Sequence, residues 1–228
     1  MEQLRNFGDC RQTGLCCYCG RGTETRDHVP SRVLLDEPFP SNLPVVFACK
    51  ECNGGFSLDE EYLACLIECV VCGTTNLNEI IRIKIKSILK SKPPLFLKIH
   101  QACQQTKNVM TFTAEMPRIK KVVLKLARGH AIYELNEPQL DEPTHLAFVP
   151  LLSMDPESRV NFEACPKSSI FPEVGSRSLQ RIVVIDPGLS LWITIQPERY
   201  RYLAYVDGGR TIIRIVIGEY LACEVAWN

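Results

Sequence analysis

Residues 16–53 read CCYCGRGTETRDHVPSRVLLDEPFPSNLPVVFACKECN, with a Cys-x-x-Cys pair at each end. A glycine follows each pair closely, which permits the tight turn of a zinc knuckle. Four thiolates from two knuckles form the closed tetrahedral set of a structural zinc site. The alternative is four buried thiols. The spacing favours zinc bound by Cys16, Cys19, Cys49 and Cys52.

Between and after the knuckles, the sequence predicts two short strands and a helix. Residues 25–29 (TRDHV) end at Pro30, and residues 43–47 (LPVVF) lead into the second knuckle. After that knuckle, residues 53–70 predict a helix with Ser57 as its N-cap and Glu60 completing a capping box. The predicted order is knuckle, strand, loop, strand, knuckle, helix. Cys17 is too near Cys19 to form a knuckle with it and is interpreted as a bystander.

This order and three motifs within it resemble the HNH endonucleases, which have a ββα-metal fold. The motifs are Asp27-His28-Val29-Pro30, Asn42-Leu43 and the Asn53 that directly follows the last cysteine. The resemblance covers residues 1–72 and implies a nuclease module there. One position departs from the family, because Phe56 stands where many members carry a basic residue.

The resemblance also implies roles for four polar residues. Asp27 and Asn53 would hold a magnesium or manganese ion through oxygen ligands. His28 would take the proton from the attacking water, and Asn42 would orient His28. Each residue has a plainer interpretation: a turn for Asp27, a surface histidine for His28, a loop residue for Asn42 and a helix N-cap for Asn53.

A strongly basic segment lies in the middle of a chain whose net charge is zero. Residues 71–130 carry 12 Lys+Arg against 2 Asp+Glu, and both flanking segments are acidic. Such a segment favours a polyanion, contacted through its backbone because aromatic residues are sparse there. The alternative is a solvated helix face. The predicted nucleic-acid contacts are Arg26, Arg32, Lys50, Lys120, Lys121, Lys125 and Arg128.

The basic segment, residues 73–140, is predicted to be mostly helical. Residues 77–92 fit a helix and a strand about equally, residues 95–105 predict a helix, and residues 109–113 predict a strand. Residues 118–128 predict a basic helix that ends with Gly129 as its C-cap. A third cysteine group, at positions 65, 69 and 72, predicts buried thiols along one helical face.

Residues 141–228 predict an antiparallel β domain, which makes the whole chain α+β. Its expected strands are rich in β-branched and aromatic residues, and Asp207-Gly208-Gly209 predicts a hairpin between two of them. The expected strands are 182–185, 191–196, 202–206, 211–217 and 221–227. The acidic balance of this domain favours packing on the helical segment or binding a partner protein.

Composition excludes several classes. With 46% hydrophobic and 23% charged residues, the chain is neither disordered nor fibrous. It has no apolar run of about 18 residues, so we expect no membrane span. The first residues lack the apolar stretch of a secretory signal, so a cytoplasmic location is expected.

The sequence thus predicts a metal-dependent HNH endonuclease that hydrolyses phosphodiester bonds, in DNA rather than RNA. By the same resemblance, it would belong with bacterial proteins of phage defence or mobile elements. The alternative is a non-catalytic zinc module that binds nucleic acid or a protein.

Overall fold

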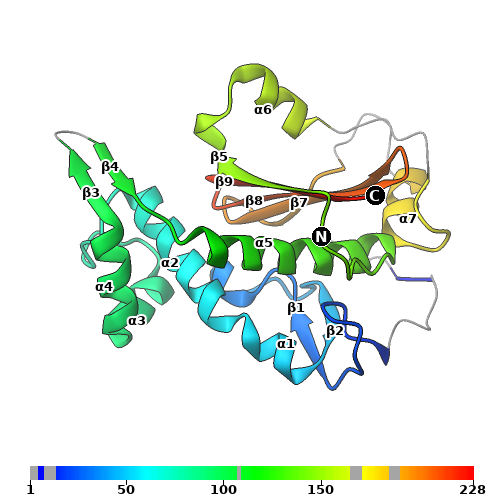
Figure 1. Ribbon diagram of the computed structural model, residues 1–228, viewed down its shortest axis with the longest axis horizontal. Helices are drawn as coiled ribbons and strands as arrows, with labels where there is room; N and C mark the ends of the chain where they lie inside the picture. Colours follow the sequence, from blue (N-terminus) through cyan, green and yellow to red (C-terminus); the bar gives the residue numbers. More distant parts are fainter. Residues whose placement is uncertain (1–4, 8–13, 107–108, 165–170, 185–190) are drawn as a thin grey trace.

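The computed structural model describes residues 5–7, 14–106, 109–164, 171–184 and 191–228. In these ranges the chain is a mixture of helices and antiparallel strands, which confirms the predicted α+β class. Figure 1 shows the long helix α5 (Met116–His130) between the first elements of the chain and a C-terminal sheet.

The knuckle segment forms a two-stranded hairpin followed by two helices. The strands pair antiparallel, as the sequence predicts. The longer helix is buried along most of its central part, because it packs against both the hairpin side and α5. The elements are β1 (Thr25–His28), η2 (Arg32–Leu34), β2 (Val45–Ala48), α1 (Lys50–Gly55) and α2 (Ser57–Cys72).

The start of α2 differs from the predicted capping box. Ser57 is the first residue of the helix, and its hydroxyl donates to the carbonyl of Gly54 at 2.9 Å. Glu60 turns into the interior, where its carboxylate accepts from Ser31 and Lys125. The capping-box prediction is therefore wrong, because a buried cation and a hydroxyl hold Glu60 instead of the helix terminus.

The middle segment forms a small group of helices and a second hairpin. The ambiguous stretch 77–92 contains a helix, since Ile85 and Leu89 are buried one turn apart while Ile81 and Ile83 are exposed. In a strand, residues 81, 83 and 85 would share one face. The elements are α3 (Ile83–Ser91), α4 (Pro93–Ala102), β3 (Cys103–Thr106) and β4 (Val109–Phe112).

Helix α5 does not end at Gly129. It runs to His130 and continues into η3 (Ala131–Leu135), which stops at Asn136 with a left-handed backbone. A Cβ on residue 129 would lie 2.6 Å from Cγ2 of Val29. The C-cap prediction is wrong, and the close approach of Val29 is what requires glycine here.

The C-terminal segment forms a five-stranded antiparallel sheet in the order β5-β9-β8-β7-β6. Gly208 and Gly209 both have positive φ in the predicted hairpin between β7 and β8. The strands are β5 (His145–Pro150), β6 (Ile193–Gln196), β7 (Tyr200–Asp207), β8 (Arg210–Ile217) and β9 (Leu221–Trp227).

Three short helical elements accompany the sheet: η4 (Leu151–Ser153), α6 (Pro156–Glu163) and α7 (Arg177–Val184). The strand predicted at 182–185 is wrong for residues 182–184, which belong to α7; residue 185 lies outside the described residues. Arg181 of α7 pairs with the buried Glu134, and Arg177 donates to the carbonyl of Tyr133. These tertiary contacts outweigh the β preference of residues 182–184.

The three predicted segments share one hydrophobic core. This core includes Val46 from the first hairpin, Leu126 from α5 and Tyr202 from the sheet. Helix α5 is the common element, because it contacts α2 on one side and β8 and β9 on the other. None of the helices in the described part of the chain has the length and apolar character needed to cross a bilayer.

Candidate functional site

The four predicted cysteine ligands come together. The sulfur atoms of Cys16, Cys19, Cys49 and Cys52 all lie within 4.8 Å of one another. Those of Cys19 and Cys49 are 3.8 Å apart, close to the separation of about 3.8 Å that a tetrahedral Zn–S length of about 2.3 Å requires. The cluster can therefore bind a metal ion, and its ligand set and spacing fit zinc.

The backbone around each pair brings the sulfurs together. In the first knuckle, Gly20 has a φ of 72° and donates its N–H to the carbonyl of Cys16 at 2.8 Å. In the second, Cys49 caps α1, and its sulfur accepts from the N–H of Cys52 at 3.4 Å. Cys17 is buried but lies outside the cluster, as the bystander interpretation predicts.

Electrostatics favour thiolate formation at the exposed member of the cluster. The guanidinium of Arg21 donates to the sulfur of Cys19 at 3.4 Å and lowers the pKa of this thiol to about 6. Burial has the opposite effect on Cys52 and raises its pKa. A bound metal ion requires all four cysteines as thiolates.

The remaining cysteines of α2 do not extend this site. Cys65 and Cys69 are fully buried, and burial raises the pKa of both thiols to about 12. Across the residues that the structure describes, the four-cysteine cluster is the one group of His, Cys, Asp or Glu with metal-binding geometry. The prediction of buried thiols is confirmed for Cys65 and Cys69 and is wrong for Cys72, which is half-buried and donates to Glu68 at 3.5 Å.

Asn53 lies beside the strand that carries Asp27 and His28. It stands within α1 and not at its N-cap, which corrects the plainer interpretation. Its amide Nδ2 donates to Oγ1 of Thr25 at 3.1 Å and to the carbonyl of Arg26 at 3.2 Å. The Arg26 carbonyl belongs to the peptide bond that precedes Asp27. Since Nδ2 is used in this way, Oδ1 is the amide atom left to act as a metal ligand.

Asp27 is buried under charged and aromatic side chains. Its Oδ2 accepts from the Tyr18 hydroxyl at 2.9 Å and pairs with Nζ of Lys125 at 2.8 Å. Lys125 is only 1% exposed and also contacts Glu60 and the hydroxyl of Ser31. Tyr18 and Lys125 both contact Oδ2 of the Asp27 carboxylate, so Oδ1 is its oxygen for an ion.

His28 follows Asp27 in a regularly paired strand. Asp27 lies opposite Val46 and His28 opposite Val45, so the two side chains point to opposite faces. The resemblance implies a local distortion here, and the four described pairs of the hairpin contain none. Nε2 of His28 lies 3.2 Å from a guanidinium nitrogen of Arg32.

The environment of His28 keeps its imidazole neutral. Burial is the largest cause and lowers the pKa of His28 below its ordinary value, and the positive charge of Arg32 lowers it further. Asp27 acts in the opposite direction. A neutral imidazole near pH 7 can accept a proton. Asn42 is half-buried in the loop before β2.

The predicted nucleic-acid contacts differ in exposure and in the partners that they already have. Arg26, Arg32, Lys50 and Lys120 are exposed. Lys121 is exposed but pairs with Asp59 at 2.8 Å.

Two of these predictions, both on α5, require correction. Lys125 is buried, and Arg128 donates to the carbonyls of Leu140 and Asp141. The phosphate track predicted along α5 is therefore wrong at Lys125, which is buried, and at Arg128, whose guanidinium is held by backbone carbonyls.

Sequence reasoning missed the buried cluster of Tyr18, Ser31, Glu60 and Lys125 around Asp27. A lysine between valine and leucine residues of an amphipathic helix is one signal that it faces inward. Its partners are distant in sequence, so nothing local identifies them.

Comparison with protein-family models, curated proteins and solved structures finds no match to this chain.

Proposed function

We propose that this protein is a phosphodiesterase of the HNH type that has a structural zinc site and acts on DNA. The observation that carries the proposal is the position of Asn53, whose amide bonds to the carbonyl that precedes Asp27, next to a four-cysteine cluster. The order of the elements also supports it: Asn53 from α1 lies beside β1, the strand that carries Asp27 and His28, and the two cysteine pairs flank this hairpin.

Each residue would have a role that matches its chemistry: metal binding for the oxygen ligands and proton transfer for the imidazole. Oδ1 of Asn53 and Oδ1 of Asp27 are hard oxygen ligands of the kind that magnesium or manganese accepts together with water. Such an ion supplies the counter-charge that phosphodiester hydrolysis needs. Neutral His28 would accept the proton of the attacking water, since burial, and then the charge of Arg32, lower the pKa of its imidazole.

A second function is favoured by one specific contact. The Lys125 ammonium already neutralises Asp27, and the regular strand separates the Asp27 and His28 side chains. If this arrangement persists with DNA present, the protein is a non-catalytic zinc module that binds nucleic acid.

Plasmid nicking with magnesium or manganese separates the two functions. We expect wild-type protein to nick, and His28→Ala and Asn53→Ala each to lose activity by a factor of at least about 100. His145→Ala is the matched control, because His145 is exposed on the C-terminal sheet and is expected to leave nicking unchanged. All proteins are compared at equal zinc content. Equal nicking by His28→Ala and wild type, or none by wild type with either ion, contradicts the nuclease and supports the binding module.

A further inference from the structure

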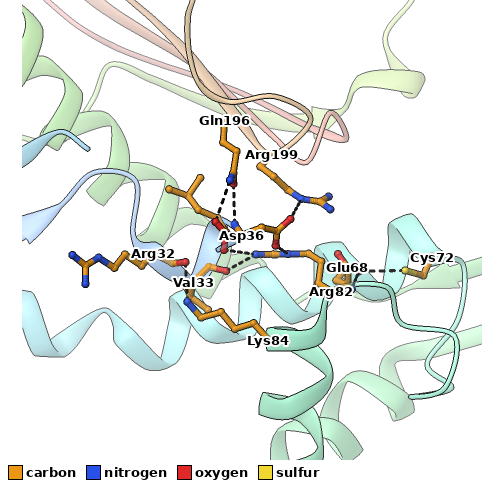
Figure 2. Close-up of polar contacts among 10 residues, drawn as sticks. Arg32, Val33, Asp36, Glu68, Cys72, Arg82, Lys84, Gln196 and Arg199 are labelled. Atoms are coloured by element: carbon orange, nitrogen blue, oxygen red, sulfur yellow. Dashed lines mark hydrogen bonds and ion pairs between the residues drawn. The ribbon is translucent and has the colours of Figure 1, made fainter. Parts of the chain in front are cut away.

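A cavity of about 570 Å³ opens beside the start of α3, on the side of the hairpin loop that carries Arg32 and Asp36. Its polar lining includes Arg82, Lys84 and Ser87 from the α3 region, Arg199 from the turn between β6 and β7, and the acidic residues Asp36 and Glu37. Figure 2 shows Asp36 between Arg82 and Arg199, with Lys84 reaching toward Arg32. Neither the predicted catalytic residues nor the cysteine cluster line this cavity.

The two arginines are fixed in place by one carboxylate. Nε of Arg82 lies 2.6 Å from Oδ1 of Asp36, and Nε of Arg199 lies 2.5 Å from Oδ2. Burial alone would raise the pKa of Asp36, but the bonds from the two arginines outweigh it and lower that pKa. The main chain of Asp36 is also held, by two hydrogen bonds to the amide of Gln196. Two positive charges thus share one negative charge, in a rigid arrangement (Figure 2).

Lys84 adds a third cation to the same cavity. Its ammonium donates to the carbonyl of Arg32 at 3.0 Å and lies 4.7 Å from the ring centre of Phe39. Burial is the main cause that lowers its pKa; the carboxylate of Glu37 raises it, and the charges of Arg82 and Arg32 lower it further. A bound anion would stabilise the charged form of Lys84, which this environment destabilises.

A chain of contacts links Lys84 of the cavity to His28 of the candidate catalytic strand, although neither His28 nor Arg32 lines the cavity. Arg32 connects the two, because its guanidinium lies 3.2 Å from His28 while its carbonyl accepts from Lys84. The same Phe39 ring supports both Arg32 and Lys84, at 5.5 and 4.7 Å. A strand of phosphates passing His28 would therefore meet Arg32 and then Lys84.

Apolar side chains lie at the edge of the cavity. Ile81 is 73% exposed and Ile83 is 85% exposed, although both belong to the wall of the cavity. Exposed aliphatic groups next to fixed cations suit a ligand that joins a phosphate to a group with an apolar face, such as a nucleobase. The volume is in the range of small-ligand pockets, which run from about 300 to 1,000 Å³.

We propose that this cavity binds one nucleotide of a single DNA strand, with its phosphate at Lys84 and Arg199 and its base against Ile81 and Ile83. The inference rests on the proposed function, because it treats DNA as the ligand and His28 as the place of cleavage. It assigns substrate contact to α3 instead of α5, where the sequence predicted it.

One residue of the cavity is negatively charged and would repel a bound phosphate, so its replacement should change DNA affinity in the opposite direction to replacement of a lysine. Glu37 is exposed and lines the cavity near Lys84. Removing its charge should strengthen DNA binding, whereas removing the charge of Lys84 should weaken it. A gain of affinity cannot result from misfolding, so Glu37→Gln keeps the proposal testable even if Lys84→Gln folds poorly.

The experiment measures binding without cleavage. Fluorescence anisotropy of a labelled single-stranded DNA oligonucleotide is recorded with zinc-loaded protein, in the absence of added magnesium, over a range of salt concentrations. Lys90→Gln is the matched control, since Lys90 is an exposed lysine of the same helix outside the cavity. We expect Lys84→Gln to weaken binding and to reduce the slope of log K against log salt by about 0.7, the value for one phosphate contact to a single strand.

The possible outcomes separate this inference from the proposed function. Weaker binding by Lys84→Gln, tighter binding by Glu37→Gln and no change by Lys90→Gln support the cavity, even if no variant nicks plasmid DNA. Equal slopes for Lys84→Gln and Lys90→Gln overturn it, even if the wild type is a nuclease. Wild-type protein that does not bind the oligonucleotide overturns it as well.

Discussion

The ammonium of Lys125 lies 2.8 Å from Oδ2 of Asp27 and also contacts Glu60, so one buried cation serves two buried carboxylates. This pair joins α5 to β1 across the interior of the protein. It connects fold and function, because Asp27 is both a predicted metal ligand and a member of the core.

Replacing Lys125 should strongly destabilise the fold. Lys125→Met leaves Asp27 and Glu60 without their cation, and breaking a buried ion pair costs about 3–5 kcal/mol. Urea unfolding of the zinc-loaded protein measures the loss. The control is Lys120→Met on the exposed side of the same helix, which should change the free energy of unfolding by less than about 0.5 kcal/mol. Equal stability of Lys125→Met and wild type would show that this pair does not form.

Removing one cluster cysteine should remove the zinc. We expect one zinc ion per chain in wild-type protein and none in Cys49→Ala, because a closed site needs all four thiolates. Cys17→Ala is the matched control, since Cys17 is also buried but lies outside the cluster. Zinc content by elemental analysis decides the result. Loss of zinc in both variants would mean that Cys17 is a ligand.

Adding a methyl group at residue 129 should destabilise the contact between α5 and the loop after β1. The Cβ of Gly129→Ala would lie 2.6 Å from Cγ2 of Val29, and overpacking of this kind costs about 1–3 kcal/mol. The double variant with Val29→Ala should recover part of the loss if the clash is the cause. Thermal unfolding provides the comparison. Gly54→Ala in α1 meets no atom within 4 Å and should not lower the melting temperature.

Gly129 and Lys125 also mark the limit of what sequence alone predicts. The hairpin, the four-cysteine cluster and most of the C-terminal strands follow from local signals, namely cysteine spacing and β-branched runs. Gly129 looked like a helix terminus because a glycine after a basic helix has that meaning locally. Only the approach of Val29, which is distant in sequence, shows that the helix needs glycine for packing.

The charge pattern was misleading for a similar reason. Helix α5 packs against α2 on one side and against the sheet on the other, so some of its basic residues, such as Lys120 and Lys121, are exposed and others are not. Lys125 is therefore used inside the protein, while Lys84 of α3 lines a cavity. The distribution of charge along the sequence shows where basic residues lie but does not say which lysines face the solvent.

Acid should weaken the protein through His130, which lies at the end of α5 against the sheet. The imidazole is fully buried, stacks on Tyr202 at 3.7 Å between ring centres and bonds through Nε2 to the Tyr200 hydroxyl at 2.7 Å. Within the described residues its Nδ1 has no partner, and burial lowers the pKa of His130 to about 3. In the unfolded chain the same group has its ordinary pKa near 6.5.

The sign of the effect follows from these two values. Between pH 6.5 and about 3 the unfolded chain binds a proton at this residue that the folded chain does not bind. The stability that neutral His130 contributes is therefore complete above pH 6.5 and is lost as the pH falls. The loss approaches about 1.4 kcal/mol per pH unit from this group alone. The free energy of unfolding of wild type and His130→Phe is measured from pH 7.5 to 4.5. Zinc and the carboxylates affect both proteins, so the difference between the two slopes of free energy against pH reports on His130. Parallel slopes would mean that His130 is already protonated, or equally accessible, in the folded protein.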